Sequence, residues 1–170
     1  PIDLHVMGLE AMGAKFELSK EGIRATAKEL LGASVELKFP SVGATENIMT
    51  AAVLANGITT IDNAAREPDI VDLGDFLISM GAKIEGLGTP LITITGVEVL
   101  HPTDHTTITD RIITGTWAFA AAMTRGDITI HGARPEHLEI PLEKLASAGA
   151  IITSTADGIR VKMDVRPQAI

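Results

Sequence analysis

Several residue types are absent or scarce in this chain of 170 residues. It contains no cysteine and no tyrosine, aromatic residues make up 3%, and Lys plus Arg number 14 against 22 for Asp plus Glu. Without cysteine these residues hold no disulfide, no thiolate ligand for a metal and no cysteine nucleophile. Nucleic-acid binding relies on basic patches and stacking rings, so a net charge of −8 with few aromatic residues argues against a nucleic-acid partner.

Long apolar runs are also missing from the sequence. No stretch reaches about 18 consecutive apolar residues, the length that a membrane-spanning helix needs. The first residues do not have the charged and apolar regions of a secretory signal peptide. We therefore expect a cytoplasmic protein with no membrane partner.

What the sequence does contain is a globular composition, with 45% hydrophobic and 21% charged residues. It also contains an internal repeat. Gly-Ala pairs that end an amphipathic run begin at Gly13, Gly81 and Gly149, at two equal intervals of 68 residues. Residues 51–61 resemble residues 120–130 at an interval of 69. Several matches in the same order predict a repeated supersecondary unit.

The middle unit can be read element by element. Alternating apolar residues indicate strands, and helical spacing of apolar residues indicates helices. This reading predicts a turn at 40–44, strands at 34–39, 58–61, 83–85 and 91–95, and helices at 45–56 and 68–80. The predicted order is β-α-β-α-β-β.

The neighbouring units give the expected extent of the fold. Residues 1–33 show only helix, strand, strand, and residues from about 105 to 163 are expected to hold a whole unit. The fold class is therefore α/β with about two and a half repeated units. Because such repeats bury their faces on one another, we expect the chain to be a segment of a larger protein or to have another chain as its neighbour.

One loop has the features of an anion site. Residues 40–45 join a strand to a helix N-terminus, where unbonded backbone N–H groups and the helix dipole favour an anion. Gly43 permits a close approach, and the hydroxyl of Ser41 or Thr45 can donate to the ligand. The alternative is that Thr45 only caps the helix.

Other candidate positions are weaker. Asp110 beside Arg111 could be an ion pair that fixes a turn or a pair of site residues near a ligand. The alternative is a capping carboxylate beside a solvated arginine. The polar residues 63–69 could hold a substrate or be a capped loop. Trp117 and Phe119 are expected in the core. The five histidines show no metal-ligand spacing, so we expect neither a metal site nor a cofactor.

Several stretches of the sequence carry a family resemblance. Residues 39–49, 63–73 and 80–84, together with 110–112, 114–116 and 166–170, resemble the UDP-N-acetylglucosamine 1-carboxyvinyltransferases over essentially the whole chain. The resemblance implies transfer of enolpyruvyl from phosphoenolpyruvate to the 3′-hydroxyl of UDP-N-acetylglucosamine with release of phosphate, in peptidoglycan precursor synthesis. It also implies two similar domains, each an inside-out α/β barrel of three repeats.

The resemblance divides the chain between those domains. Residues 1–107 correspond to the last one and a half units of one domain, and 108–170 to the first unit of the second. The implied hinge residues are Asp110 and Arg111. The implied substrate-binding residues are Pro1, Ile2, Asp3, Leu4, Phe39, Pro40, Ser41, Val42 and Gly43.

The resemblance also implies departures from the family pattern. Some members have Lys in place of Phe39, and many have Glu in place of Ile113. The family's general acid lies before Pro1 and its base after Ile170, so no catalytic residue is expected here, and the chain is expected to be inactive without the remaining segments of the protein.

Two alternatives remain beside this interpretation. A non-catalytic repeat module that self-assembles would also show near-equal repeats without catalytic groups. A sister enolpyruvyl transferase acting on shikimate 3-phosphate would share the fold, although the Ser41–Thr45 and Ala65–Pro68 stretches disfavour it.

Overall fold

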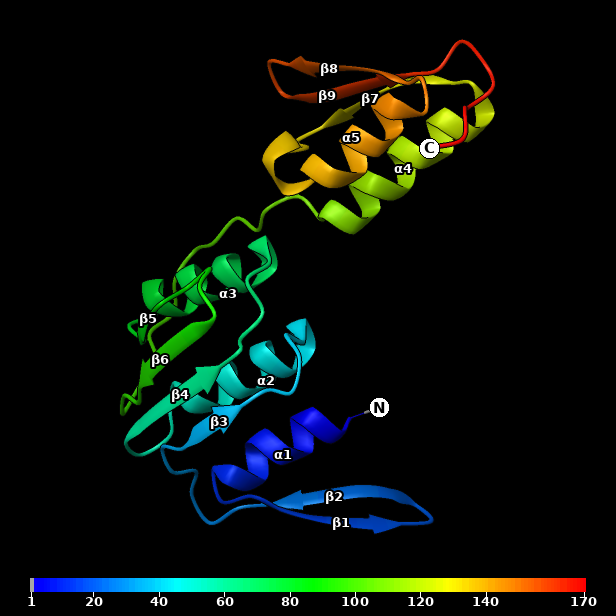
Figure 1. Ribbon diagram of the computed structural model, residues 1–170. Coiled ribbons are helices and arrows are strands. Elements are labelled where there is room, and N and C mark those ends of the chain that lie inside the picture. The colour runs from blue at the N-terminus through cyan, green and yellow to red at the C-terminus, as the bar shows by residue number, and fades with distance from the viewer. Residues whose placement is uncertain (1) are drawn as a thin grey trace. The chain divides into compact units, whose positions relative to one another are not determined.

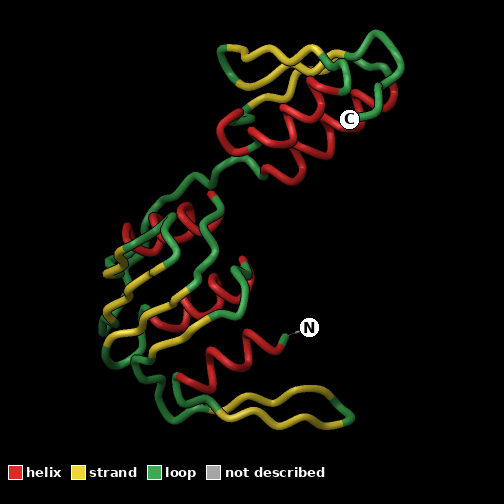
Figure 2. Tube along the Cα trace, viewed as in Figure 1, coloured by secondary structure: helices red, strands yellow, loops and turns green. Residues whose placement is uncertain are grey.

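The computed structural model describes residues 2–170, which form two compact units with their boundary between Thr106 and Thr107 (Figure 1). The first unit opens with helix α1 (Asp3–Ala11) and a hairpin of β1 (Lys15–Ser19) and β2 (Gly22–Thr26). This is the predicted order of helix, strand, strand. The two strands pair only with each other, in register from Lys15 with Thr26 to Ser19 with Gly22 (Figure 2).

The rest of the first unit has the predicted β-α-β-α-β-β order. Its strands form one sheet in the order β3-β4-β6-β5, in which β3 runs parallel to β4 and the other pairs are antiparallel. The elements are β3 (Ser34–Glu36), α2 (Val42–Ala52), β4 (Ile58–Asp62), α3 (Pro68–Ser79), β5 (Lys83–Glu85) and β6 (Leu91–Thr95).

The predicted bounds of α2 were wrong at both ends. The helix begins at Val42, inside the predicted turn, because Ser41 lies in an extended conformation and its Oγ accepts a hydrogen bond from Ala44 N. It ends before Asn56, because the backbone of Asn56 bonds instead to Leu30 O and Gly32 N. A contact with a distant segment therefore decides where this helix stops.

The core of the first unit lies between the sheet and its helices. Ile61, Ile92 and Ile94 of the sheet are fully buried against Ile48 of α2. Helix α1 packs against α2 at a very small separation (Figure 1). A Cβ added to Gly8 of α1 would lie 2.3 Å from Ile48 Cδ1. Glycine at position 8 therefore permits this close approach of the two helices.

The second unit has its own core and a three-stranded antiparallel sheet in the order β7-β9-β8. Its elements are α4 (Arg111–Thr124), β7 (Asp127–His131), the short 3₁₀ helix η1 (Pro135–His137), α5 (Glu139–Ser147), β8 (Ile151–Thr155) and β9 (Gly158–Lys162).

The expectation of a whole unit from about residue 105 to 163 was wrong in one element. Within residues 2–170 no strand lies between β6 and α4. The chain here is held by a side chain, since Thr109 Oγ1 donates to Gly132 O at 2.7 Å, whereas β3 is held to β4 by a backbone ladder. The observed order in the second unit is therefore α-β-α-β-β.

The three Gly-Ala pairs picked out by their spacing end three helices in the same way. Gly13, Gly81 and Gly149 have positive φ angles of 99°, 105° and 105°. In each case the glycine N–H bonds to the carbonyl three residues earlier at 2.9 Å, and the alanine N–H bonds five residues back at 3.0 Å. This bonding is the Schellman motif, which needs a left-handed residue that only glycine adopts at low cost.

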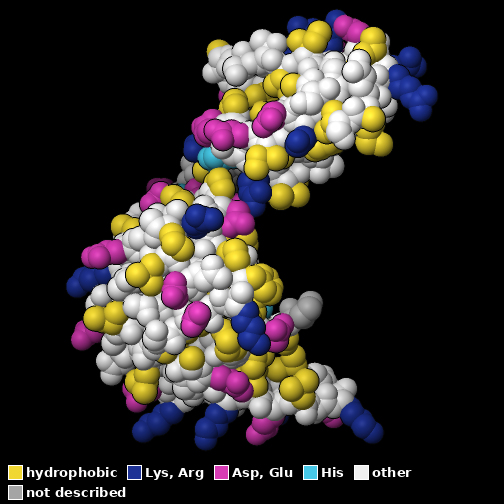
Figure 3. All heavy atoms as spheres, viewed as in Figure 1, with side chains coloured by type: hydrophobic (Ala, Val, Ile, Leu, Met, Phe, Trp, Pro, Cys, Tyr) yellow, Lys and Arg dark blue, Asp and Glu magenta, His cyan; other side chains and the backbone are white. Residues whose placement is uncertain are grey.

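The prediction that Trp117 and Phe119 belong to the core was wrong. Their side chains are 59% and 43% exposed on α4. Two positions advance about 200° around a helix, so the two side chains lie on different faces of α4. Phe119 borders a groove between α4 and α5, and no helix of the described second unit packs over Trp117 as α1 packs over α2. Apolar side chains accordingly reach the surface of the unit that carries α4 and α5 (Figure 3).

A membrane-spanning helix requires greater length and apolarity than any helix among residues 2–170 possesses.

Candidate functional site

Two sequence-distant segments with predicted binding residues meet in the first unit, where the N-terminal parts of α1 and α2 lie side by side. His5 of α1 makes the connection. Its Nδ1 lies 3.0 Å from Asn47 Nδ2 on α2, and its Cε1 lies 3.3 Å from the place where a Cβ on Gly43 would stand. A Cβ at position 43 would require the His5 ring to shift by a few tenths of an ångström, so glycine keeps the surface beside the α2 N-terminus open.

The predicted residues of the first segment differ in accessibility. Pro1 lies outside the described residues. Ile2 and Asp3 are exposed at the start of α1, and the Ile2 carbonyl accepts from Val6 N at 3.0 Å. Leu4 is buried in the core, so its side chain anchors α1 while its backbone stays at the helix start. Ile2 and Asp3 are the side chains that a ligand could reach.

The second predicted segment leads from β3 into α2. Phe39 is 58% exposed and Pro40 is exposed as well. Ser41 is the N-cap of α2, and its Oγ stands 3.4 Å from Ala44 N, a long hydrogen bond. Val42 packs against the core, and Gly43 is the second helical residue. The amides of Val42 and Gly43 precede the first intrahelical bond, from Thr45 N to Ser41 O, so they can donate to an anion.

The alternative that Thr45 caps this helix was wrong, because Ser41 is the cap. Thr45 is completely buried, and its hydroxyl links two segments of the chain. Its Oγ1 donates to Ser41 O at 2.8 Å and accepts from Ala65 N at 3.1 Å. Thr45 thereby fixes the loop before α3 to the first turn of α2.

The loop before α3, residues 63–69, also has a mainly structural geometry. Asn63 adopts a left-handed φ of 55°, and its Nδ2 donates to Leu37 O at 2.9 Å. Arg66 N donates to the Glu67 carboxylate at 2.9 Å, which fixes the turn into the helix. Arg66 itself is exposed. The loop is therefore tied to the ends of β3 and α2 beside the predicted anion site.

Carboxylates determine the electrostatics near the N-terminus of α2. Glu46, in the second turn of α2, has a pKa above its ordinary value, first because burial penalises the charged form and second because Asp69 repels it. No acidic residue occupies the first turn of α2. The positive end of the α2 dipole is therefore not compensated by an acidic residue in the first turn of its own helix, and the nearest carboxylate on α2, one turn further on, has a raised pKa.

His5 and Asn47 were missed as members of the site by sequence reasoning. Gly43 and Asn47 are four residues apart, so their sharing of a helix face could have been recognised. Which helix that face meets depends on tertiary packing. His5 Nδ1 accepts from the Asn47 amide when the ring carries its hydrogen on Nε2.

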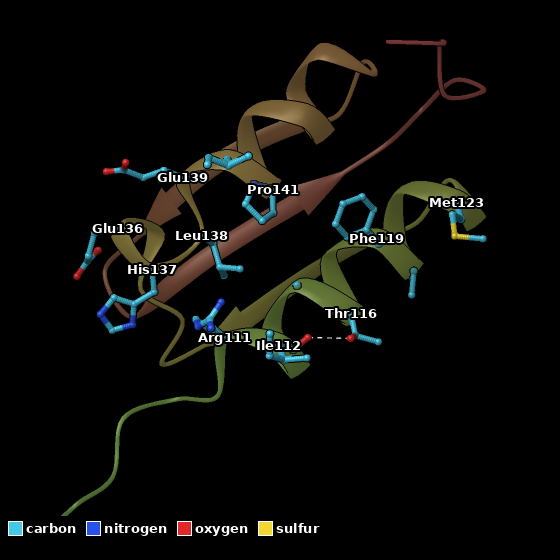
Figure 4. Close-up of a pocket in the computed structure, with 13 residues that line it drawn as sticks. Arg111, Ile112, Thr116, Phe119, Met123, Glu136, His137, Leu138, Glu139 and Pro141 are labelled. Atoms are coloured by element: carbon cyan, nitrogen blue, oxygen red, sulfur yellow. Dashed lines mark hydrogen bonds between the residues drawn. The ribbon is translucent and has the colours of Figure 1, made fainter. Parts of the chain in front are cut away.

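The predicted pair in the second unit has separate roles. Asp110 is the N-cap of α4, and its Oδ1 accepts from Ile112 N at 2.7 Å and from Ile113 N at 3.0 Å. The alternative of a capping carboxylate is thus confirmed. Arg111 lies at the edge of a groove of about 810 Å³ between α4 and the segment from η1 into α5 (Figure 4).

This groove is mainly apolar. Phe119 of α4 faces Pro141 of α5 across it, Leu138 lies nearer Arg111, and Glu136, His137 and Glu139 stand at one end (Figure 4). Among residues 2–170 no group of three or more His, Cys, Asp or Glu side chains could hold a metal ion. The polar chemistry in this groove is limited to its rim.

Comparison with known proteins identifies the fold first. The chain matches the enolpyruvyl transferase NikO from Streptomyces tendae with a TM-score of 0.80 and 23% identity, over 96% of this chain and 42% of that one. It matches EPSP synthase from Acinetobacter baumannii with a TM-score of 0.63 and 21% identity, over 95% of this chain and 38% of that one. At these identities the matches show the α/β fold of enolpyruvyl transferase domains.

A sequence profile then places the chain in a family. The profile of EPSP synthase (3-phosphoshikimate 1-carboxyvinyltransferase) matches residues 1–170, and the chain belongs to this family of carboxyvinyltransferases. The resemblance to enolpyruvyl transferases inferred from the motifs is confirmed.

Individual relatives are much more similar than the solved structures. The chain is 56% identical to UDP-N-acetylglucosamine 1-carboxyvinyltransferase of Corynebacterium jeikeium over 170 residues, which are all of this chain and 41% of that protein. The protein of the same name in Mycobacterium leprae is 54% identical over the same length, again 41% of it. The chain thus spans about two fifths of the length of these curated relatives.

Proposed function

We propose that this chain is part of an enzyme that transfers the enolpyruvyl group of phosphoenolpyruvate to the 3′-hydroxyl of UDP-N-acetylglucosamine and releases phosphate. The observation that carries the proposal is the identity of 54–57% over essentially the whole chain to relatives of that name. The product would serve peptidoglycan precursor synthesis in the cytoplasm.

The geometry supports a nucleotide site in the first unit. The α2 N-terminus offers the amides of Val42 and Gly43 to a diphosphate, and Gly43 lets that group approach the backbone. Ile2 and Asp3 at the start of α1, with Phe39 and Pro40 before α2, are exposed around it and would contact the nucleoside. Phe39 offers a ring and no charge, so we propose that the phosphates are held by helix amides more than by a lysine at this position.

The two units would belong to two domains of the longer protein. Residues 1–107 would be the last one and a half repeats of one inside-out barrel, and 108–170 the first repeat of the second, with Asp110 and Arg111 at the crossing. The remaining segments of the protein would cover the exposed apolar face of α4 and pair with the open hairpin of β1 and β2. The general acid and the general base of the reaction would lie in those segments.

Phosphate release tests this proposal. The assay supplies phosphoenolpyruvate and UDP-N-acetylglucosamine to the chain alone and to a longer chain that extends it to the length of its relatives. Phosphate is expected only from the longer chain. Release by neither protein would contradict the transferase, and release by residues 1–170 alone would contradict the placement of the catalytic groups.

A binding measurement tests the site separately. Titration of the longer chain with UDP-N-acetylglucosamine by calorimetry is expected to show a Kd at least tenfold higher for Gly43→Val, because the valine side chain meets His5 and fills the approach to the amides. Gly115→Ala on α4 is the matched control, since its Cβ would make only an ordinary contact with Leu138 at 3.5 Å. Equal affinities of both variants would contradict a site at Gly43.

The sister reaction is the second candidate, because the family profile that matches is that of 3-phosphoshikimate 1-carboxyvinyltransferase. Replacing UDP-N-acetylglucosamine by shikimate 3-phosphate in the phosphate assay separates the two reactions. A non-catalytic module that self-assembles would give no phosphate with either acceptor and would elute as a defined oligomer.

A further inference from the structure

The segment that follows β6 is fastened along α3 at both ends. His101 N donates to Met80 O at 2.8 Å, at the C-terminal end of that helix. Four residues later, His105 Nε2 lies 3.1 Å from Asp72 Oδ1, near the helix N-terminus. We call residues 101–105 the strap.

The spacing of the two fastening points fits an extended strap that runs antiparallel to α3. Met80 and Asp72 are eight residues apart on a helix, a rise of about 12 Å at 1.5 Å per residue. Residues 101 to 105, fully extended, span about 13 Å at 3.3 Å per residue. The strap is therefore long enough to run along the helix between its two points of attachment.

His105 is held by two contacts and not by its hydrogen bond alone. Its ring stacks on Phe76 with centroids 4.9 Å apart and 25° between the planes. Asp72 and Phe76 are four residues apart, so they share one face of α3 and receive the imidazole together. The His105 and Asp72 side chains are only 19% and 16% exposed. By contrast, the His131–Asp157 pair has the same separation of 3.1 Å with side chains that are 76% and 72% exposed.

We propose that His105, Asp72 and Phe76 form a clasp that sets the length of the tether between the two units. With the clasp closed, only residues 106–108 lie between His105 and Thr109, whose side chain is bonded to Gly132 of the second unit. With it open, the next attachment is His101, and residues 102–108 are released. The tether then doubles from four residue steps to eight, and its greatest reach doubles from about 14 Å to about 28 Å. The clasp thus limits the range of positions that the second unit can take.

Limited proteolysis tests whether the clasp holds the strap. Endoproteinase Asp-N cleaves before aspartate, and Asp104 lies inside the strap. Asp72→Asn removes the carboxylate charge, keeps a neutral acceptor oxygen and leaves the cleavage site untouched. It is expected to raise the cleavage rate before Asp104 about fivefold when cleavage follows the open population, because a hydrogen bond to a charged acceptor is stronger than one to an amide oxygen by about 1 kcal/mol. Asp75→Asn makes the same charge change at an exposed position of α3 and is expected to leave the rate unchanged.

A rate for Asp72→Asn equal to that of the parent chain would overturn the clasp. Equal acceleration by Asp75→Asn would do so too, because it would indicate a general weakening of α3. Helix content by circular dichroism shows whether each variant is folded. His105→Ala opens the clasp from its other side and is a second test. If the two residues act as one unit, the double variant His105→Ala with Asp72→Asn is expected to be cleaved no faster than His105→Ala alone.

A distance measurement tests the consequence for the tether. The chain has no cysteine, so Glu85→Cys in the first unit and Ser154→Cys in the second accept a unique pair of spin labels. Asp72→Asn is expected to broaden the distance distribution, and disruption of the exposed His131–Asp157 pair by Asp157→Asn is expected not to. An unchanged width in Asp72→Asn with accelerated proteolysis would refute control of the tether while leaving the strap attached as described.

Discussion

Helices α2 and α4 begin alike and end up in different surroundings. At the repeat interval of 69 residues, the N-cap Ser41 corresponds to the N-cap Asp110, and buried Thr45 corresponds to buried Thr114. Each threonine Oγ1 donates to the carbonyl of its N-cap residue at 2.8 Å. Yet Ile48 of α2 is completely buried, whereas its counterpart Trp117 on α4 is 59% exposed.

The local sequence determines where each helix begins, whereas packing against a neighbouring helix determines which of its apolar side chains are buried. Ile48 is buried because α1 lies across it at Gly8. Trp117 stands where α4 has no such neighbour in its unit. An apolar residue at the right helical spacing is therefore a candidate for burial, and the neighbour must be known before it is assigned to the core.

The largest expected effect comes from truncating the two corresponding residues. Ile48→Ala leaves a cavity in the core and is expected to lower the free energy of unfolding of the first unit by about 3 kcal/mol. Trp117→Ala removes an exposed side chain and is expected to change the free energy of unfolding of the second unit by no more than about 0.5 kcal/mol. Hydrogen exchange of the α2 and α4 amides in denaturant measures both. A comparable loss in the two units would contradict the comparison.

The second effect concerns two glycines on helices. Gly8→Ala places a Cβ against Ile48 and is expected to destabilise the first unit by about 1.5 kcal/mol, since overpacking outweighs the gain in helix propensity. Gly115→Ala meets only Leu138 at 3.5 Å and is expected to stabilise the second unit by about 0.5 to 1 kcal/mol. Urea unfolding followed by circular dichroism measures these changes. Stabilisation by both substitutions would mean that α1 is not closely packed on α2.

The third effect separates the two helix caps. Asp110→Ala removes an acceptor of two short hydrogen bonds and is expected to destabilise the second unit by about 1 kcal/mol. Ser41→Ala removes one hydrogen bond of 3.4 Å and is expected to destabilise the first unit by less than half of that amount. Hydrogen exchange of the α2 and α4 amides in denaturant measures the two losses separately, and the fluorescence of Trp117, the only tryptophan, reports the second unit during urea unfolding. Equal losses at the two caps would contradict the difference in geometry.

The smallest effect depends on pH. Folding raises the pKa of Glu46, so the folded chain binds a proton more tightly and stability declines as pH rises from the ordinary value of 4.5 through the raised value. Glu46→Gln is expected to stabilise the first unit by about 0.5 kcal/mol at pH 7, because it removes the charge that burial and Asp69 disfavour. The gain is expected to vanish below pH 4, where glutamate is protonated in both states. A gain that persists there would assign the effect to side-chain packing.

Local patterns predicted the parts of the fold that local forces determine. The strands at 83–85 and 91–95 were predicted to the residue, because alternating apolar residues with a glycine-containing turn define a hairpin from the local sequence alone. The start of α2 was predicted three residues too late, because Gly43 suggested a turn that the Ser41 cap overrides. The strand expected before α4 has no backbone ladder, which no feature of residues 105–110 reveals.

The candidate site was predicted only in part for the same physical reason. Ser41 and Gly43 stand out because a strand, a small-residue loop and a helix occur in succession. His5 and Asn47 come from helices more than 40 positions apart, and their hydrogen bond exists only after α1 has packed on α2. The exposure of Trp117 likewise depends on a neighbour that periodicity does not encode.

The Schellman motifs at Gly13, Gly81 and Gly149 have a consequence for building new proteins. Each stops its helix with the same two hydrogen bonds and the same left-handed glycine, so the chain leaves each helix with the same local backbone geometry. Helix-ending Gly-Ala pairs are therefore natural splice points, at which the hairpin after one helix could be exchanged for the hairpin after another. Chimaeras joined at these pairs would retain the backbone path across the junction, and exchange at any other point would have to recreate it.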